Sequence, residues 1–354
     1  MDIRKFIVFV VLSLSCGLTY AHDFVVTLDG QKVYFNIVSS KNKTVEITYN
    51  GSIANAVPTY FEGELTVPSK VKHNDVVYSV VRIGKKAFSG ADKLTGVILP
   101  EGLTEIGDFA FEGCTSLSRI IFPGNRVKFG EGVFFKCDKI QDLSFGSDWK
   151  ELELKMFRWS DSLVSIVVPV KVEKIRNMKS LKHLRNISVD MNNSRFSSSD
   201  GILYNKNKET LYGCPRAYSG PVKVYEGTKY IISGAFIDCE DITGVDLPAS
   251  LTQMSFNEFS RMRNLRKLIF RGEKPIMTAE DEKGTDVFLL QVHKGVKIKI
   301  SVPKESMKLY RKSFVQKSGE YSIIGETTPY FIDIDTMPKK NSIVGIKNIL
   351  KIGL

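Results

Sequence analysis

The fold of this chain is decided by one stretch, residues 106–123, which reads IGDFAFEGCTSLSRIIFP. One period later, residues 129–145 read FGEGVFFKCDKIQDLSF and keep the spacing of glycine, phenylalanine, cysteine and apolar residues. The phenylalanine recurs every 23 residues, at Phe88, Phe111, Phe134 and Phe157. Repetition at a period of about 20–29 residues is the signature of a solenoid, in which each repeat buries its apolar side against its neighbours.

Each repeat contains a strand signal and a turn signal. Residues 120–122 alternate between the two faces of a short strand, and Pro123 closes it because proline cannot donate to a ladder. Residues 106–114 are too few for an ordinary helix and predict a turn that places Phe111 in the core. Stacked copies therefore predict a parallel ladder of strands about 4.8 Å apart, with a continuous column of phenylalanine inside.

The repeat continues past these copies with one interruption. Residues 147–169 keep the apolar spacing, whereas residues 170–190 lack the Ala-Phe-Cys signal. After an insertion, the pattern returns at residues 235–248 and 259–270. We therefore expect the stack to bend or loosen around residues 170–190 without ending there.

These motifs carry a family resemblance. Residues 107–117, with their closing Ile-x-Phe-Pro, resemble the BspA-type leucine-rich repeat, also called the Treponema pallidum type, of bacterial surface and secreted proteins. Residues 196–211 resemble the β-hairpin that interrupts many of these arrays, and residues 300–304 with Tyr310 resemble their closing segment. The resemblance implies a leucine-rich-repeat solenoid, mostly β, built as a right-handed superhelix of short parallel strands and turns. It also implies a binding role at the cell surface or toward a host.

The chain divides by pattern into seven segments. Two alternating runs around Asp29-Gly30 predict a hairpin near the N-terminus, and residues 44–49 predict a further strand. Such strands at one end, and a C-terminal segment at the other, would cover the exposed ends of a solenoid. The expected segments are a signal peptide (1–21), an N-terminal β cap (22–75), repeats (76–190), a β-hairpin insertion (191–221), repeats (222–270), a C-terminal cap (271–335) and a tail (336–354).

The first residues predict export. Arg4-Lys5 precede an apolar run over residues 6–14, and the small residue Ala21 offers a cleavage site, which together are typical of a secretory signal peptide. Lipidation at Cys16 is the alternative, although Ser13 stands where a lipidation motif has leucine. No later stretch reaches about 18 uninterrupted apolar residues, so we expect no transmembrane segment after the signal peptide. The predicted location is the cell surface, the periplasm or the extracellular space.

The sequence offers no catalytic, cofactor or metal site. Cys114, Cys137 and Cys239 share one repeat position, which predicts buried core residues; a disulfide is disfavoured because stacked side chains point in parallel. The four histidines are scattered, and no nucleophile, phosphate-loop or zinc motif accompanies them. The acidic residues 280–282, with Asp286, have ligand types that suit Ca²⁺, but a solvated loop is favoured. We therefore expect a protein that is not an enzyme.

A protein or peptide partner is expected on the outward face of the strands. Positions between the core residues form two columns that contain β-branched apolar side chains but no aromatic ones, which argues against sugar stacking there. Strand propensity alone accounts equally well for the valines and isoleucines. The candidate residues of this face are Ile98, Arg119, Ile121, Asp142, Val167, Asn186, Lys267 and Ile269.

Charge suggests a second surface. The chain carries 50 Lys and Arg against 39 Asp and Glu, and residues 294–317 contain eight cations against Glu305 alone. Lys308, Arg311 and Lys312 are the candidate anion-binding residues, and an anionic glycan is a possible ligand. Solubility of the cap explains the same charge, and no nucleic-acid-binding signature accompanies it.

The sequence thus predicts a non-enzymatic binding or adhesion protein of the bacterial cell envelope. It would present the sheet face of the solenoid to a protein of the host matrix or of a bacterial surface. Two alternatives stay open: a structural envelope component with no external ligand, and a binder of anionic glycan through the basic C-terminal cap.

Overall fold

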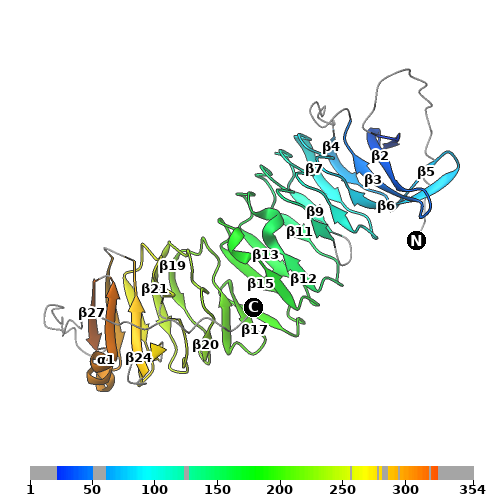
Figure 1. Cartoon of the computed structure of the whole chain (residues 1–354). Helices are drawn as coiled ribbons and strands as arrows, with labels where there is room; N and C mark the ends of the chain where they lie inside the picture. Colours follow the sequence, from blue (N-terminus) through cyan, green and yellow to red (C-terminus); the bar gives the residue numbers. More distant parts are fainter. Residues whose placement is uncertain are drawn as a thin grey trace. The chain divides into compact units, whose positions relative to one another are not determined.

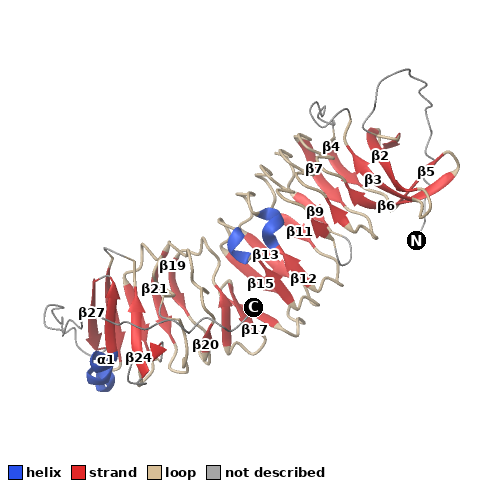
Figure 2. Ribbon diagram, viewed as in Figure 1, coloured by secondary structure: helices blue, strands red, loops and turns tan. Residues whose placement is uncertain are grey.

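The computed structural model describes residues 22–50, 61–122, 127–255, 257–276, 279–280, 286–293, 296–318 and 320–325 (Figures 1 and 2). The predicted signal peptide, the tail, Pro123 and the acidic residues 281–282 lie outside these ranges. The chain folds as two compact units. Unit 1 contains residues 1–184 and 189–195, and unit 2 contains residues 185–188 and 196–354.

Unit 1 begins with an antiparallel meander that leads into the first repeat. The predicted hairpin is present, with β1 and β2 joined by Asp29 and Gly30, whose φ angles of 47° and 80° suit a tight turn. The third strand pairs parallel with the first strand of the array, so the meander extends the solenoid sheet. This sheet contains β1 (Phe24–Leu28), β2 (Gln31–Ser39), β3 (Thr44–Thr48), β6 (Val76–Ile83), β8 (Glu105–Ile106) and β10 (Lys128–Phe129), with β5 (Lys70–His73) antiparallel to β6.

A second parallel sheet in unit 1 is built from the strands that close each repeat. Successive strands advance by one repeat, so equivalent residues such as Val97 and Ile120 are register partners and both are buried. The sheet runs in the order β11 (Asp142–Ser144), β9 (Arg119–Ile121), β7 (Lys93–Ile98) and β4 (Glu62–Thr66) (Figure 1). The predicted parallel ladder is confirmed for these four strands.

The ladder does not continue from β11 to the next repeat, and here the sequence prediction was wrong. In the described sheets of unit 1, β13 (Ser165–Val168) is not paired with β11, and β12 (Glu151–Glu153) pairs with β14 (Lys174–Arg176) instead. The buried ring of Trp149 packs edge-on against Phe122 and Phe145 at this point, with centroid distances of 5.8 and 5.0 Å. We infer that this extra ring displaces the following repeat. Two 3₁₀ turns, η2 (Leu154–Phe157) and η3 (Met178–Ser180), occupy the same region.

The predicted phenylalanine column is confirmed. The rings of Phe88, Phe111, Phe134 and Phe157 stack nearly parallel, with centroids 4.9, 5.3 and 5.1 Å apart and interplanar angles of 8°, 19° and 13°. All four side chains are fully buried. Phe61 extends the column by one tilted ring, 5.1 Å from Phe88. Each repeat therefore buries one aromatic ring against the rings of its two neighbours, as the 23-residue period requires.

The turns of successive repeats are also bonded to one another. The amide of Phe88 donates to the carbonyl of Ala110 at 2.8 Å, and the amide of Phe111 donates to the carbonyl of Val133 at 2.9 Å. These bonds satisfy backbone groups that lie outside both sheets and would otherwise be left unpaired. The turn side of unit 1 is therefore a third ladder.

The cysteines at the shared repeat position are buried, as predicted, and they donate hydrogen bonds. The thiol of Cys114 donates to the carbonyl of Phe88 at 3.2 Å, and the thiol of Cys137 donates to the carbonyl of Phe111 at 3.0 Å. One repeat later, the hydroxyl of Ser160 makes the same bond to Phe134 at 3.0 Å. In these three repeats the position therefore links a side-chain donor to the preceding turn, and the four cysteines that the structure describes are free thiols.

Unit 2 contains the predicted hairpin and a parallel sheet. The strands β16 (Phe196–Ser199) and β17 (Ile202–Asn205) are antiparallel around Asp200-Gly201, and they continue into β18 (Thr210–Gly213) and β20 (Tyr230–Ile231). The sheet runs β19 (Gly220–Lys223), β21 (Ile242–Leu247), β22 (Lys267–Phe270), β25 (Lys297–Val302) and β27 (Glu320–Gly325). The remaining elements are β15 (Asn186–Val189), β23 (Ala279–Glu280), β24 (Asp286–Gln291), η4 (Lys304–Ser306), α1 (Met307–Ser313) and β26 (Phe314–Ser318).

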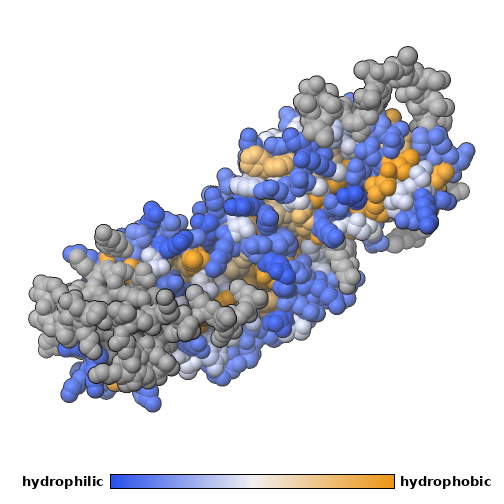
Figure 3. Space-filling view, viewed as in Figure 1, coloured by the Kyte–Doolittle hydropathy of each residue, from blue (hydrophilic) through white to orange (hydrophobic). Residues whose placement is uncertain are grey.

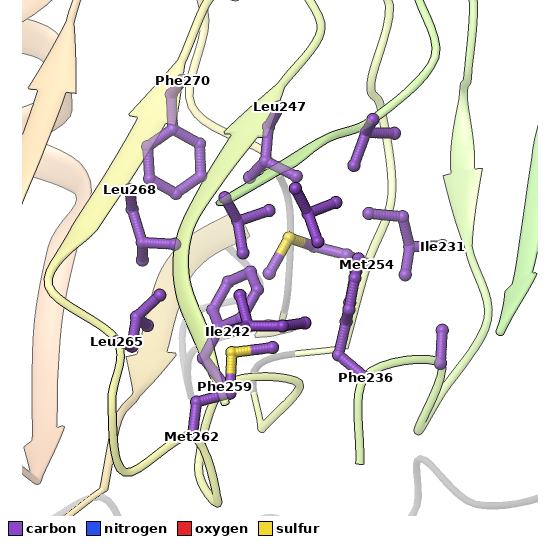
Figure 4. Close-up of a cluster of buried hydrophobic side chains, with 14 of the residues drawn as sticks. Ile231, Phe236, Ile242, Leu247, Met254, Phe259, Met262, Leu265, Leu268 and Phe270 are labelled. Carbon is purple, nitrogen blue, oxygen red and sulfur yellow. The ribbon is translucent and has the colours of Figure 1, made fainter. Parts of the chain in front are cut away.

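The core of unit 2 is built in the same way as the core of unit 1, but it contains fewer aromatic side chains. Phe236 and Phe259 are fully buried, with ring centroids 6.1 Å apart, and Leu268 and Met262 pack into the same cluster (Figure 4). The buried carboxylate of Glu258 accepts from the amides of Gly234 and Phe236 at 2.5 and 3.2 Å. This carboxylate joins two repeats, and the sequence pattern did not predict it.

Candidate binding surfaces

The four-stranded sheet of unit 1 brings four of the predicted residues together. Ile98 on β7 and Ile121 on β9 are register partners, and both are half-buried on the outward face. Arg119 and Asp142 are register partners on β9 and β11, and both are exposed. We call these four residues the sheet-face patch. An apolar pair thus lies directly beside a charged pair on one sheet.

Arg119 joins two other strands of this sheet through ion pairs. Its Nη1 lies 2.9 Å from Oε2 of Glu64 on β4, and its Nε lies 3.2 Å from Oδ2 of Asp142 on β11. Gly96 is the register partner between Glu64 and Arg119, and a Cβ there would lie 2.9 Å from the Glu64 carboxylate. Because Gly96 has no side chain, Arg119 can reach across β7 to Glu64. Sequence reasoning missed Glu64 because it precedes Arg119 by 55 residues.

These ion pairs order the surface more than they stabilise the fold. The side chains of Arg119, Glu64 and Asp142 are 46 %, 40 % and 64 % exposed, and exposed pairs contribute only about 0–1 kcal/mol. Their effect is to hold the guanidinium in one extended conformation. A partner that meets this face therefore encounters a charged row that is already positioned.

The other predicted residues of the sheet face lie elsewhere. Val167 is 55 % exposed on β13, outside the sheet that carries the patch. In unit 2, Asn186 packs against the hairpin turn, where a Cβ on Gly201 would lie 2.7 Å from its Oδ1. Within unit 1, the four residues of the sheet-face patch therefore share one sheet, and Val167 lies outside it.

Lys267 and Ile269 lie on β22 of unit 2 in different surroundings. Lys267 is exposed, and its register partners are Gly244 and Lys299. Ile269 is half-buried between Asp246 and Ser301, so no apolar stripe accompanies it. The described surface is hydrophilic over most of the face seen in Figure 3, with hydrophobic residues in small separate groups.

The structure places the predicted anion-binding residues on one short helix. Lys308, Arg311 and Lys312 all belong to α1 and are exposed, and their spacing of three and four residues puts them on one helix face. Tyr310, on the other side of α1, is fully buried, and its hydroxyl donates to the carbonyls of Gly272 and Lys274 at 2.9 and 3.0 Å. We call the three cations the basic helix face.

Burial favours the neutral forms of two cysteines and one tyrosine in the core. Contact with the Cys137 thiol, and then burial, raise the pKa of the Cys114 thiol well above its usual range. Burial raises the pKa of the Cys214 thiol in the same direction and raises the pKa of Tyr204 to about 12. A thiol reacts as its thiolate, so the neutral Cys114 and Cys214 side chains serve as core residues and not as nucleophiles.

The histidines serve packing and surface contacts in the described residues. His73 stacks on Phe24 with ring centroids 4.2 Å apart, and Nε2 of His183 lies 3.3 Å from Oδ1 of Asp161. Within the described ranges, no group of three or more histidine, cysteine or acidic side chains lies close enough to hold a metal ion. No helix in the same ranges is long and apolar enough to cross a membrane.

The repeat geometry corresponds to a known family. The sequence matches the family described as "BspA type Leucine rich repeat region" in six copies, over residues 68–198 and 207–279, which is more than half of the chain. The chain belongs to the BspA-type leucine-rich repeat family. Members of this family are bacterial surface proteins with general roles in adhesion and protein interaction, and they are typically not enzymes.

Solved structures with similar folds come from several bacteria. The pneumococcal vaccine antigen PcpA is 19 % identical, with a TM-score of 0.45, and the match covers 87 % of this chain and 100 % of that one. A leucine-rich repeat protein of Eubacterium ventriosum is 17 % identical, with a TM-score of 0.41 and 84 % of each chain covered. The leucine-rich repeat protein of T. pallidum is 20 % identical, with a TM-score of 0.38, covering 59 % of this chain and 87 % of that one. No curated protein matches the chain.

Proposed function

We propose that this protein is an exported binding protein of the bacterial cell envelope that uses the sheet-face patch of unit 1 to contact a protein of the host matrix or of a bacterial surface. Family membership supports an interaction role. One observation supports this location most directly. Ile98 and Ile121 are register partners, and they lie beside the row formed by Glu64, Arg119 and Asp142.

The two parts of the patch have different roles in this proposal. The half-buried isoleucines supply apolar area that a partner removes from water, at about 25 cal/mol per Å². The charged row determines the orientation of the partner and disfavours partners of unsuited charge, because complementary charges contribute specificity more than affinity. Since the row is already ordered, little side-chain entropy is lost on binding.

Replacing both Ile98 and Ile121 with lysine is expected to weaken binding at least tenfold, or about 1.4 kcal/mol. Two unpaired cations would be buried in the middle of an apolar contact, which is unfavourable. The measurement is the dissociation constant for the matrix protein that binds best in a panel of purified extracellular matrix proteins. Because both isoleucines are half-buried on the outward face and not in the core, the variant should still fold, and thermal unfolding measures how much stability it loses.

Two control variants make this result specific. Val77→Lys adds a cation at an apolar side chain that is 50 % exposed on β6, outside the patch, and should leave binding unchanged. Reversal of the basic helix face, with glutamate at Lys308, Arg311 and Lys312, should also leave it unchanged. If reversal of the helix face abolishes binding and the isoleucine variant does not, the contact surface is the basic helix face and not the sheet-face patch.

The cell-surface location has its own test. Protease treatment of intact cells should remove the protein if it is displayed outside the cell, as the predicted signal peptide and the family suggest. A structural component of the periplasm would be spared by the same treatment. Survival of the full-length protein on protease-treated intact cells would therefore favour the structural alternative over an adhesin.

A further inference from the structure

The turn side of unit 1 carries a row of aromatic side chains that the sheet-face patch does not use. Phe109 lies in the turn between β8 and β9, Phe135 in the turn after β10, and Trp159 two residues after the end of η2. The rings of Phe109 and Phe135 meet edge to face with centroids 6.2 Å apart, and those of Phe135 and Trp159 do the same at 5.7 Å. All three side chains are partly exposed. We call them the aromatic row.

The fold does not require aromatic residues at these positions. Phe109 is equivalent to Lys86 one repeat earlier and to Gly132 one repeat later, because each is 23 residues away. By the same spacing, Phe135 is equivalent to Glu112, and Trp159 is equivalent to Lys136. Neighbouring turns therefore form the same structure with charged residues or glycine. The packing of the repeat therefore does not explain why aromatic side chains occupy these three positions.

Backbone geometry indicates that the ring of Phe109 is held in place at a cost. Its φ angle is 55°, a left-handed conformation that is unfavourable for a bulky side chain. The ring lies against Gly132, where a Cβ would come within 2.5 Å of the ring carbon Cε1. The chain thus has a glycine where the ring needs space and a strained phenylalanine beside it. The same left-handed φ recurs at the equivalent Lys86 and Gly132, at 56° and 58°, so the turn imposes this conformation and a bulky ring is the costly choice for it.

Two cations accompany the aromatic row. Nζ of Lys136 lies 5.3 Å from the ring centroid of Phe135, and Cζ of Arg158 lies 5.1 Å from the ring centroid of Trp159. Both side chains are exposed, and within the described residues neither forms an ion pair with a carboxylate. Lys86 on the same side, by contrast, has a carboxylate of Glu112 3.8 Å away. The row therefore combines apolar rings with positive charge that is not neutralised.

We propose that the aromatic row binds an acidic segment of a protein partner, whose apolar side chains pack on the rings and whose carboxylates pair with Lys136 and Arg158. Tryptophan and arginine are enriched among the residues that dominate protein interfaces. The net charge of +11 would attract an acidic partner at long range. A sugar ring is a poorer fit, because the rings of Phe135 and Trp159 each hold a cation over one face and meet their neighbours edge to face.

The test selects peptides on the full-length protein from a displayed random library. The selected peptides are expected to combine acidic residues with aromatic or leucine residues, and to bind more weakly as salt rises. Removal of both cations, with Lys136→Gln and Arg158→Gln, should lower their affinity at least tenfold. The matched control, Lys70→Gln with Lys93→Gln, removes two exposed cations elsewhere in unit 1 and should leave affinity unchanged.

The fluorescence emission of Trp159 also measures binding at the aromatic row directly. The chain has two tryptophans, and Trp149 is only 2 % exposed, so a Trp149→Phe variant isolates the emission of Trp159. Bound peptide should shift this emission to shorter wavelength and protect it from iodide quenching. The proposal is overturned if no peptide is enriched, if the enriched peptides are neutral or basic, or if they bind the glutamine variant unchanged. A shift caused by uronic acid oligosaccharides alone would assign the row to a glycan instead. A selected peptide that loses affinity in the glutamine variant, but not in the variant with lysine at Ile98 and Ile121, binds the aromatic row and not the sheet-face patch.

Discussion

Replacement of Phe111 by alanine is expected to lower the free energy of unfolding by about 3–5 kcal/mol. The ring is fully buried and stacks between Phe88 and Phe134 at 4.9 and 5.3 Å, so its removal leaves a cavity with rings on two sides. That loss is a large share of the roughly 5–15 kcal/mol that stabilises a typical domain. Denaturant unfolding followed by circular dichroism measures it.

The loss at Phe111 should be local. Solenoid repeats contact only their neighbours, so hydrogen exchange should increase mainly over residues 80–160. Phe135→Ala is the matched control, because this ring is one residue from the column but partly exposed, and it should cost clearly less. Uniform protection across those turns in the Phe111 variant would contradict the column as the source of stability.

Replacement of Gly130 by alanine is expected to cost about 1–3 kcal/mol, although it adds a single methyl group. A Cβ at Gly130 would lie 2.5 Å from the amide nitrogen of Asp108 and 2.7 Å from the carbonyl carbon of Gly107. These are backbone atoms of the preceding turn, which cannot rotate away, so the two turns must separate. Gly107 has the same relation to Lys85, at 2.7 Å from its amide nitrogen. Thermal unfolding of the two variants measures the effect.

Gly244→Ala provides the control for close approach. The nearest atom to a Cβ there is the carbonyl oxygen of Lys267 at 3.5 Å, which is ordinary van der Waals contact. Its substitution should leave the free energy of unfolding unchanged or raise it by about 0.4–1 kcal/mol, because alanine lowers the conformational entropy of the unfolded chain. Equal losses at Gly130 and Gly244 would mean that backbone flexibility, and not the contact between turns, explains the glycine of the repeat.

Several features were predictable because the period of the sequence encodes them directly. Residues 23 positions apart occupy equivalent places in adjacent repeats, so the spacing of Phe88, Phe111 and Phe134 predicts a stack of rings. The hairpin around Asp29-Gly30 was likewise recognisable, because turn chemistry and strand alternation are local properties, and the hairpin around Asp200-Gly201 was expected from the family resemblance.

The candidate sites were less predictable because they depend on residues that do not share one repeat position. The pair of Arg119 and Glu64 joins residues 55 apart and requires the absence of a side chain at Gly96 between them. The aromatic row joins Phe109, Phe135 and Trp159, which are separated by 26 and 24 residues and not by the period. The interruption after β11 also removed Val167 from the sheet that carries the patch.

The sequence by itself determined the repeat, the buried phenylalanine column, the position of the cysteines and the family, because each follows from periodic apolar residues that contact only adjacent copies. Tertiary structure alone decided which outward side chains meet. Gly96 allows Arg119 to reach Glu64, Gly132 accommodates the ring of Phe109, and Trp149 packs where the ladder ends. The physical reason is that surface contacts depend on the direction and reach of individual side chains, which a one-dimensional pattern does not specify.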